Sequence, residues 1–530
     1  MRKSLCLVIL FSFGFSFTFI SCKKTDDENS KPAIAIKDSS KVKSLIPFDS
    51  TLVSSFFAKY PKLQKYQEET TELYRKRNYQ YVWFDTKGML EVGHLLYNKL
   101  NDMEEDGIKT TIPYKEKVDS LFQNNTEKYR ASIDDELLIS SLYFFYANTV
   151  LKGMDAKKTA ELGWYLPRKK QSYVNYLDSI IANPSLFKNN NKEVSNEYYS
   201  LKEVLHKYRK IQKNNVWDSI KLDSSRTSLK LGDSSRTVTQ IRQRLFILED
   251  ISTDSKSAIY DDTLASGILK YQKRNGIKES KTITQKIIAS LNVPIENRIK
   301  TIMINMERCR WIDTDVSKSN ELIVVNIPSY QLTFFKKGKA VLTSNVVVGK
   351  ALNKTVIFSA DMRYIVFSPY WNVPTSIITK EIKPGIAKNP NYLAQHNMEW
   401  NNGNVRQKPG PKNSLGLVKF LFPNSNSIYL HDTPSKGLFN EEKRAFSHGC
   451  IRVAKPVELA NEILKDDKNW TPEKINAAMH KSKESWYTLK NKIPVYIGYF
   501  TAWVDDEGVV HFYDDVYQRD DRLATMLFEE

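Results

Sequence analysis

Residues 447–452 read Ser-His-Gly-Cys-Ile-Arg, a run of residue types that suits covalent catalysis. A glycine before a cysteine lets the backbone turn tightly and expose the thiol. His448 and Arg452 place positive charge on both sides of Cys450, and such surroundings lower the pKa of a thiol and favour the reactive thiolate. The segment therefore predicts that Cys450 is a nucleophile.

A second histidine, His431, lies 19 positions upstream of Cys450 in Tyr-Leu-His-Asp-Thr, residues 429–433. A thiol paired with an imidazole is the nucleophile–base arrangement of acyl transfer. We expect His431 to be the base, with His448 in a supporting role. Asp432 is expected to orient the imidazole, through its backbone carbonyl or its side chain. Backbone N–H groups around Gly449 and Cys450 are the expected oxyanion donors.

The pattern of His431 followed by Ser-His-Gly-Cys-Ile-Arg resembles the signature of the L,D-transpeptidase (YkuD-type) family. The resemblance implies that Cys450 attacks the third residue of a peptidoglycan tetrapeptide stem, releases D-alanine and forms a thioester. An amine of a second stem then resolves the thioester as a 3→3 cross-link. It further implies acylation by carbapenems and no need for a cofactor. Four residues match family positions near the site or suit substrate binding: Tyr429, Ser447, His448 and Arg452.

Other interpretations of the same residues stay open. His431, His448 and Cys450 form a chemically sensible zinc ligand set, although no familiar zinc spacing supports it. An L,D-carboxypeptidase or a cross-link hydrolase would use the same thiol with water as acceptor. A wall-binding lipoprotein with a decayed catalytic domain, or a buried structural Cys450, would need no chemistry at all.

Composition limits the class of protein and its partners. The 530 residues are 41% hydrophobic, which predicts a globular chain of two to four domains. A formal charge of +18 favours acidic partners. No nucleic-acid-binding motif accompanies that charge, so nucleic acid is not expected. We expect peptidoglycan stem peptides and glycan strands as partners, beside a membrane surface.

The N-terminus predicts export. Arg2 and Lys3 precede an apolar stretch over residues 5–20, which has the length of a signal peptide. It ends in Ser-Cys, which resembles a bacterial lipobox with Cys22 as the lipidated residue; a plain signal peptide is the alternative. We therefore expect a signal peptide over 1–21, a flexible tether over 22–47, and a lipid-anchored protein on the periplasmic side of the cell envelope. Cys309 reads as a buried apolar residue and not as a disulfide partner of Cys450.

Two helical domains are predicted before the β-rich part. Residues 48–225 show helical spacing of apolar residues, and the run over 74–84 resembles the scaffold region of large multidomain L,D-transpeptidases. Residues 226–294 predict three short helices. Their marker residues resemble those of a peptidoglycan-binding domain: Gly232-Asp233, Tyr260-Asp261, Tyr271-Gln272, Asn275-Gly276-Ile277 and Leu291-Asn292.

After a connecting helix within 295–318, the apolar period changes to that of strands. Residues 319–520 predict the catalytic domain, a β-sandwich or a small barrel. Within it, about 379–422 is rich in proline and glycine and reads as an irregular insertion. Such an insertion beside a reactive site is typical of a lid, and the resemblance likewise implies a capping subdomain. The expected fold class is multidomain α+β.

Overall fold

The computed structural model describes residues 46–123, 130–188, 194–313, 316 and 318–528, with no side-chain description of residue 188. The predicted signal peptide, most of the tether and Cys22 lie outside these residues. Among the helices described, none combines the length and the apolar character that a membrane span requires.

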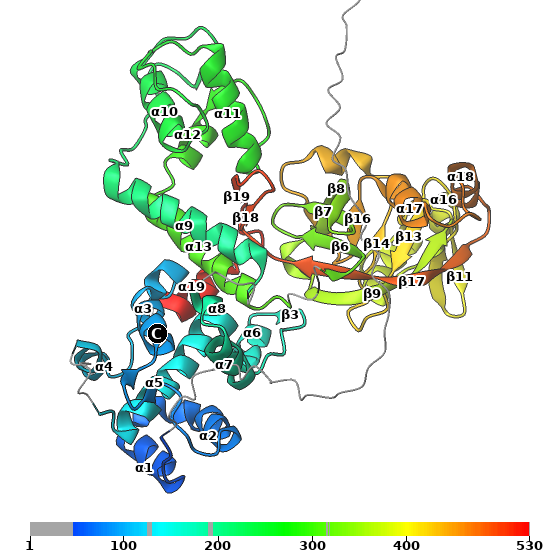
Figure 1. Ribbon diagram of the computed structural model, residues 1–530. Coiled ribbons are helices and arrows are strands. Elements are labelled where there is room, and N and C mark those ends of the chain that lie inside the picture. Colours follow the sequence, from blue (N-terminus) through cyan, green and yellow to red (C-terminus); the bar gives the residue numbers. More distant parts are fainter. Residues whose placement is uncertain (1–45, 124–129, 189–193, 314–315, 317, 529–530) are drawn as a thin grey trace, which may run out of the picture. The chain divides into compact units, whose positions relative to one another are not determined.

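Helices dominate the region from residue 46 to residue 188 (Figure 1). They bury one cluster of apolar side chains, to which α5 contributes most of its length. Ser132 caps α5 in a capping box with Asp135, which fixes where the helix begins. The elements are α1 (Thr51–Lys59), α2 (Gln67–Lys76), β1 (Phe84–Asp85), β2 (Gly88–Met89), α3 (Glu91–Asn101), α4 (Lys115–Gln123), α5 (Ile133–Tyr146), α6 (Ala156–Glu161), α7 (Tyr173–Ala182) and α8 (Ser185–Lys188).

Two long helices, α9 (Asn196–Asn214) and α13 (Ile295–Arg310), pack against each other, and their buried faces join the core of the β-rich part. The predicted helical segment 48–225 therefore contributes to more than one core. The end of the chain covers the same helices, because α19 contacts α13 and β18 contacts α9. These elements are β18 (Ala502–Val504), β19 (Val510–Phe512) and α19 (Asp520–Phe528).

A module with its own apolar cluster lies between α9 and α13 in the sequence. Its three helices and one two-stranded ladder are α10 (Arg236–Ile247), α11 (Asp262–Arg274), α12 (Gln285–Leu291), β4 (Ser228–Leu229) and β5 (Ile283–Thr284). The side chains of Ser235 and Asp261 cap α10 and α11. The three helices agree with those predicted from the apolar spacing.

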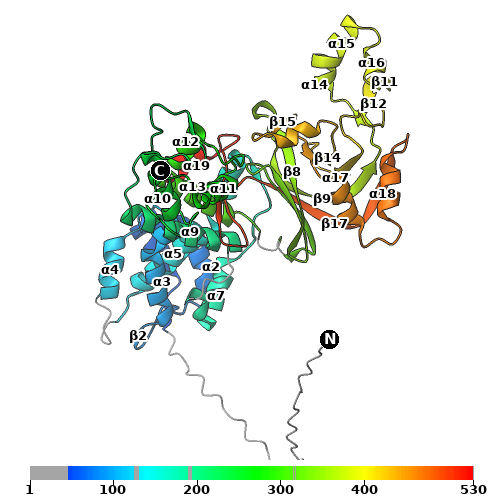
Figure 2. The same ribbon diagram turned by 90° about the horizontal axis from the view of Figure 1, so that it is seen from above.

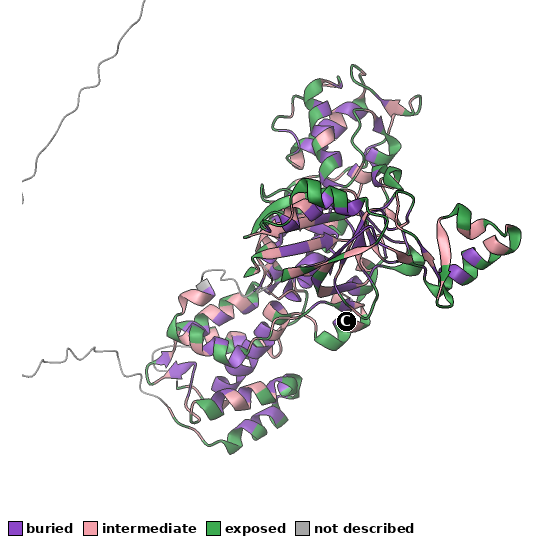
Figure 3. Ribbon diagram, turned by 90° about the vertical axis from the view of Figure 1, so that its right-hand side faces the viewer, coloured by how far each residue is buried: buried purple, intermediate pink, exposed green. Residues whose placement is uncertain are grey.

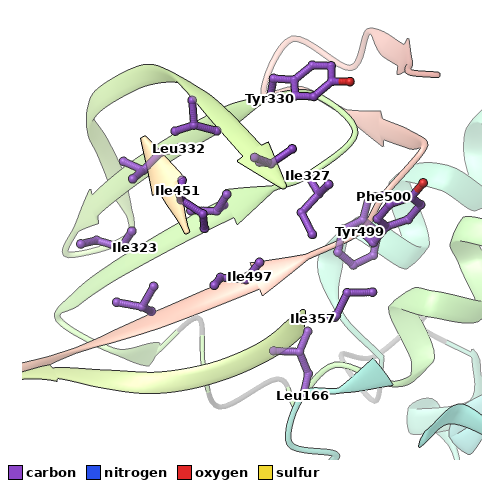
Figure 4. Close-up of a cluster of buried hydrophobic side chains, with 14 of the residues drawn as sticks. Leu166, Ile323, Ile327, Tyr330, Leu332, Ile357, Ile451, Ile497, Tyr499 and Phe500 are labelled. Atoms are coloured by element: carbon purple, nitrogen blue, oxygen red, sulfur yellow. The ribbon is translucent and has the colours of Figure 1, made fainter. Parts of the chain in front are cut away.

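The β-rich part forms one sheet, and within the described residues eight of its strands close into a barrel in the order β13-β14-β16-β8-β7-β6-β17-β9. Closure follows because β9 pairs with β17 along one edge and with β13 along the other. Figure 4 shows side chains of this core, among them Ile323, Ile451 and Ile497. The strands are β6 (Glu321–Asn326), β7 (Gln331–Lys336), β8 (Lys339–Gly349), β9 (Ile357–Phe367), β13 (Val418–Leu421), β14 (Leu430–His431), β16 (Ile451–Val453) and β17 (Ser485–Gly498).

Smaller elements extend this sheet and cover it. Strand β3 (Trp164–Tyr165) adds to β9, and β15 (Ala445–Ser447) pairs with β8. Helices α17 (Pro456–Leu464) and α18 (Pro472–Met479) pack apolar side chains into the same core. Figure 3 shows buried residues concentrated on the sheet and exposed residues on the surrounding loops.

The predicted irregular insertion is an ordered subdomain, so the prediction of an irregular stretch over 379–422 is wrong. Figure 2 shows α14 (Thr375–Ile377), α15 (Lys383–Lys388), α16 (Tyr392–Gln395), β11 (Met398–Asn401) and β12 (Asn404–Gln407) gathered together, and β10 (Trp371–Asn372) belongs to the same subdomain. Strands β10, β11 and β12 form a sheet, and Val373, Ile377, Ile378, Ile382 and Val405 form a small core. The subdomain thus begins before residue 379, and β13 within the predicted insertion belongs to the barrel. Proline and glycine occupy its turns and do not prevent the short elements between them.

Candidate active site

Two short parallel strands bring the predicted catalytic residues together. In the register of β14 and β16, Leu430 lies opposite Ile451, and both are fully buried in the barrel core. Side chains alternate along a strand, so the neighbouring residues project from the opposite face. Those residues are Tyr429, His431, Cys450 and Arg452. One face of the sheet therefore carries the predicted nucleophile, the predicted base and two predicted substrate contacts.

His431 is held in its neutral form. Its Nδ1 is hydrogen-bonded to the backbone carbonyl of Asp432, and a carbonyl can only accept, so the proton lies on Nδ1 and Nε2 keeps its lone pair. Burial is the main cause that lowers the pKa of His431 to about 3, and Arg452 and Lys419 lower it further. The imidazole is thus uncharged near neutral pH and able to take a proton.

Of the two roles considered for Asp432, the backbone carbonyl is the one that contacts the imidazole. Its carboxylate instead accepts hydrogen bonds from the N–H groups of Leu417 and Thr433, at 2.9 and 2.6 Å, and from Lys436. A side chain at position 416 would meet this carboxylate at 2.3 Å, which explains the glycine there. The carboxylate therefore fixes the loop that returns from the capping subdomain.

The pKa of the Cys450 thiol is raised above its ordinary value, contrary to the sequence prediction. Burial raises it most; hydrogen bonds from the backbone and hydroxyl of Tyr429, and the charge of Arg452, oppose that effect. His448 is exposed and contributes nothing to the shift. The thiol donates to the carbonyl of Ser427, with 3.6 Å between Sγ and the oxygen. The resting nucleophile is therefore a protonated thiol.

Ser447 shapes the turn that carries Cys450. Its hydroxyl accepts from the N–H of Gly449 at 3.1 Å and donates to the carbonyl of Cys450 at 2.5 Å. Gly449 has φ +119°, which a residue with a side chain rarely adopts. Ser447 is only 2% exposed and holds the turn, and the Gly449 N–H is engaged within it, so the substrate contact predicted for Ser447 and the oxyanion role predicted for Gly449 stay predictions. Among the described residues the Cys450 N–H has no acceptor, so it is available to donate a hydrogen bond.

Hydrogen bonds from other parts of the chain also hold the turn that carries Cys450. The Thr355 hydroxyl donates to the carbonyl of Gly449 and accepts from the N–H of Gly349, both at 2.9 Å. Tyr517 in turn donates its hydroxyl to the Gly349 carbonyl at 2.6 Å and accepts from the Thr355 N–H at 3.1 Å. The end of the chain thus braces the cysteine turn through buried hydrogen bonds, which no sequence motif revealed.

Comparison with known proteins decides which family this geometry belongs to. Residues 320–476 match the family model of the L,D-transpeptidase catalytic domain (YkuD), and residues 68–205 match the model of a scaffold domain. The chain carries an L,D-transpeptidase catalytic domain. A protein of Haemophilus influenzae named "Putative L,D-transpeptidase" is 35% identical over 222 residues, which cover 38% of this chain and 45% of that protein. The chain thus matches less than half the length of this relative.

Solved structures with weaker likeness include other L,D-transpeptidases. One from Xylanimonas cellulosilytica is 12% identical with a TM-score of 0.18, and the match covers 52% of this chain and 100% of that one. An L,D-transpeptidase solved in complex with imipenem is 12% identical with a TM-score of 0.19, over 34% of this chain and 58% of that one. TM-scores this low add nothing to the assignment, which rests on the family models and the relative.

In the transpeptidase domain a lysine lies beside His431. The sequence analysis did not single out this lysine. Lys419 on β13 lies opposite His431, and its charge lowers the pKa of that histidine. Its Nζ lies 3.9 Å from Glu484 and 5.6 Å from the ring centroid of Trp486. Lys419 alternates with buried Val418 and Phe420, as expected of a strand, although this stretch lies inside the predicted irregular insertion.

Arg452 is a cation whose charge acts on both Cys450 and His431. Its Nε is buried and has no acceptor among the described residues. The described residues contain no group of three His, Cys, Asp or Glu side chains placed to hold a metal ion. The arrangement suits acyl transfer by a thiol with a neutral base.

Proposed function

We propose that the protein is a peptidoglycan L,D-transpeptidase that forms 3→3 cross-links through a thioester on Cys450. The observation that carries the proposal is the pairing of β14 with β16, which sets the thiol and a neutral imidazole with a free Nε2 on one face. The match of residues 320–476 to the catalytic-domain model supports it. The substrate is a tetrapeptide stem, and the first product is D-alanine.

In the acylation step, Sγ of Cys450 attacks the carbonyl carbon of the third stem residue while its proton passes to Nε2 of His431. Because the thiol rests protonated and donates to the Ser427 carbonyl, the proton must change partner during the attack. The Cys450 N–H stabilises the developing oxyanion. The bond to D-alanine then breaks, and His431 returns the proton to the leaving amine.

In the second step, an amine of another stem attacks the thioester. His431 removes a proton from that amine, the new amide forms, and the thiolate leaves and regains a proton. Burial disfavours the charged imidazole, so the imidazolium is short-lived in both steps. Water in place of the amine would give a carboxypeptidase instead.

Arg452 and Lys419 are the proposed contacts for the stem carboxylate. The unpartnered buried Nε of Arg452 gains an acceptor when a carboxylate binds, and a guanidinium can hold a carboxylate with two hydrogen bonds. Lys419 adds a second positive charge on the same face. The capping subdomain is the proposed gate to this face, since its return loop is bonded to Asp432.

We also propose that the protein is located at the cell envelope. We take the N-terminal segment to be a signal peptide with lipidation at Cys22, and the module with α10, α11 and α12 to bind glycan strands. An unmodified residue at the mature N-terminus, found by mass spectrometry, would rule out the anchor.

The experiment is a muropeptide analysis of sacculi or purified tetrapeptides incubated with the protein and with Cys450→Ala. We expect 3→3 dimers and free D-alanine from the wild type and neither from the variant. Tripeptides without dimers would instead identify an L,D-carboxypeptidase. Full activity of Cys450→Ala would refute the thioester mechanism. In parallel, mass spectrometry should detect a covalent adduct of imipenem with wild type and none with Cys450→Ala.

A further inference from the structure

A cavity of 310 Å³ has none of Tyr429, His431, Cys450 and Arg452 among its lining residues, although Tyr517 in its wall also helps to brace the cysteine turn. Its walls come from parts of the chain far apart in sequence: the turn into β3, the end of α13, the start of β9, and residues 517–523. Trp164 on β3 belongs to the same buried cluster as the barrel, so the cavity lies within one continuous body. Its size is at the lower end of the range of small-molecule sites.

Positive charge in the cavity walls exceeds negative charge. Four cationic side chains line it, against the single carboxylate of Glu161: Arg308, Lys354, Arg519 and Arg522. Among the described residues only Arg308 has a carboxylate partner, Asp520 at 2.7 Å. Lys354 donates only to the carbonyl of Tyr517, at 3.2 Å. The walls are therefore suited to an anion.

Two buried donors in the walls have no acceptor among the described residues. They are Nε1 of Trp164, a residue only 4% exposed, and Nε of Arg519. Another nitrogen of Arg519 donates to the carbonyl of Leu162, so this guanidinium is fixed in place. A buried donor without an acceptor is unfavourable, and a ligand oxygen that accepts from it would relieve that cost.

The walls also include an apolar part, which comes from Trp164, Trp311, Ile357 and Leu523. We propose that this cavity binds a small carboxylate whose oxygens accept from Trp164 and Arg519 and whose apolar part lies against these side chains. Arg522, exposed near the end of the chain, adds the attraction that draws the anion in. Inorganic phosphate shares the charge but lacks the apolar part.

The test is calorimetric titration of the full chain with N-acetyl-D-alanine, its neutral amide, and inorganic phosphate. We expect saturable binding of the carboxylate and none of the amide. Trp164→Phe removes one donor, Arg522→Gln removes one charge, and each should weaken binding about tenfold. Arg363→Gln, which changes an exposed arginine on β9 outside the cavity, should leave the dissociation constant unchanged.

Arg452→Gln changes the active-site face but not the cavity, so it is a control that should not alter the titration. Equal binding of amide and carboxylate, binding of phosphate alone, or full affinity in both cavity variants would overturn the proposal. Thermal unfolding of each variant shows whether the fold is kept; if Trp164→Phe unfolds, the comparison of Arg522→Gln with Arg363→Gln still decides. The result is independent of muropeptide products, so its failure leaves the proposed transpeptidation untouched.

Discussion

The last turn of α13 and the turn before β16 each carry a cysteine, and the two surroundings differ in instructive ways. Cys309 on α13 is fully buried, and burial together with Glu197 raises the pKa of its thiol well above the ordinary value. Cys450 is partly exposed, and burial raises the pKa of its thiol as well, against the opposing effects of Tyr429 and Arg452. Both thiols are therefore protonated at neutral pH.

A raised pKa thus does not separate a structural thiol from a nucleophile in this protein. The two cysteines differ instead in the groups that surround them. The turn before β16 offers an exposed path, a neutral imidazole on the adjacent strand and a backbone N–H without an acceptor; the helix around Cys309 offers none of these within the described residues. The reactivity we propose for Cys450 depends on a base that removes its proton during the reaction, not on a thiolate formed beforehand.

Removal of that base is expected to have the largest effect. His431→Gln should lower the rate of Cys450 acylation by about 10²–10⁴-fold, the usual contribution of a general base. The measurement is the rate of imipenem adduct formation by mass spectrometry, alongside transpeptidation of tetrapeptides. His448→Gln is the matched control, since that histidine is exposed, and should stay within about twofold of wild type. Equal losses in the two variants would mean that His431 is not the base.

Alkylation should separate the two cysteines directly. We expect iodoacetamide to modify Cys450 in the folded protein at least roughly 100-fold faster than Cys309, whose exposure needs local unfolding. The rate at Cys450 should keep rising above neutral pH, because the pKa of its thiol is raised. Peptide mass spectrometry at several pH values measures both rates, and urea should equalise them. A rate at Cys450 that levels off below pH 7 would contradict the raised pKa.

Sequence reasoning singled out Cys450 and His431 because their residue types and spacing are local signals, and the structure brings them onto adjacent strands; their roles as nucleophile and base stay predictions. It also reached the three short helices, whose apolar residues recur at helical spacing. It misjudged the thiol pKa because the positive charges at 448 and 452 are visible in the sequence, whereas burial arises only when distant strands pack around Cys450.

The same limit explains the other differences. Strand β9 runs without a break through Ala360 and Asp361, where its apolar pattern is interrupted, because it pairs with the long β17. Lys419 and Tyr517 gain their importance through partners far along the chain, His431 and Thr355. Such roles depend on the register of strands and cannot be found from spacing alone.

Acid should weaken the folded state around the active site. The pKa of His431 is about 3 in the folded chain, against an ordinary value of 6.5, so below pH 6.5 the unfolded chain binds a proton that the folded chain does not. The free energy of unfolding is therefore not reduced by His431 above pH 6.5. It falls as the pH drops from 6.5 toward 3, and at pH 5 it is lower by about 2 kcal/mol. Urea midpoints at pH 7.5 and pH 5 measure the decline. It should be smaller in His431→Gln, and an identical decline in both proteins would contradict the buried neutral imidazole.

Cys309→Ala should produce the smallest effect and the cleanest contrast with Cys450→Ala. Replacing a buried thiol by a methyl group leaves a small void in the packed core, with an expected cost of about 1 kcal/mol in the free energy of unfolding. Activity should remain within about twofold of wild type, because Cys309 contacts none of the groups that surround Cys450. The urea midpoint and the transpeptidation rate, measured on the same preparation, test both statements. A variant that keeps its stability yet loses activity would show that the helix thiol takes part in the chemistry, and the distinction between the two cysteine surroundings would then fail.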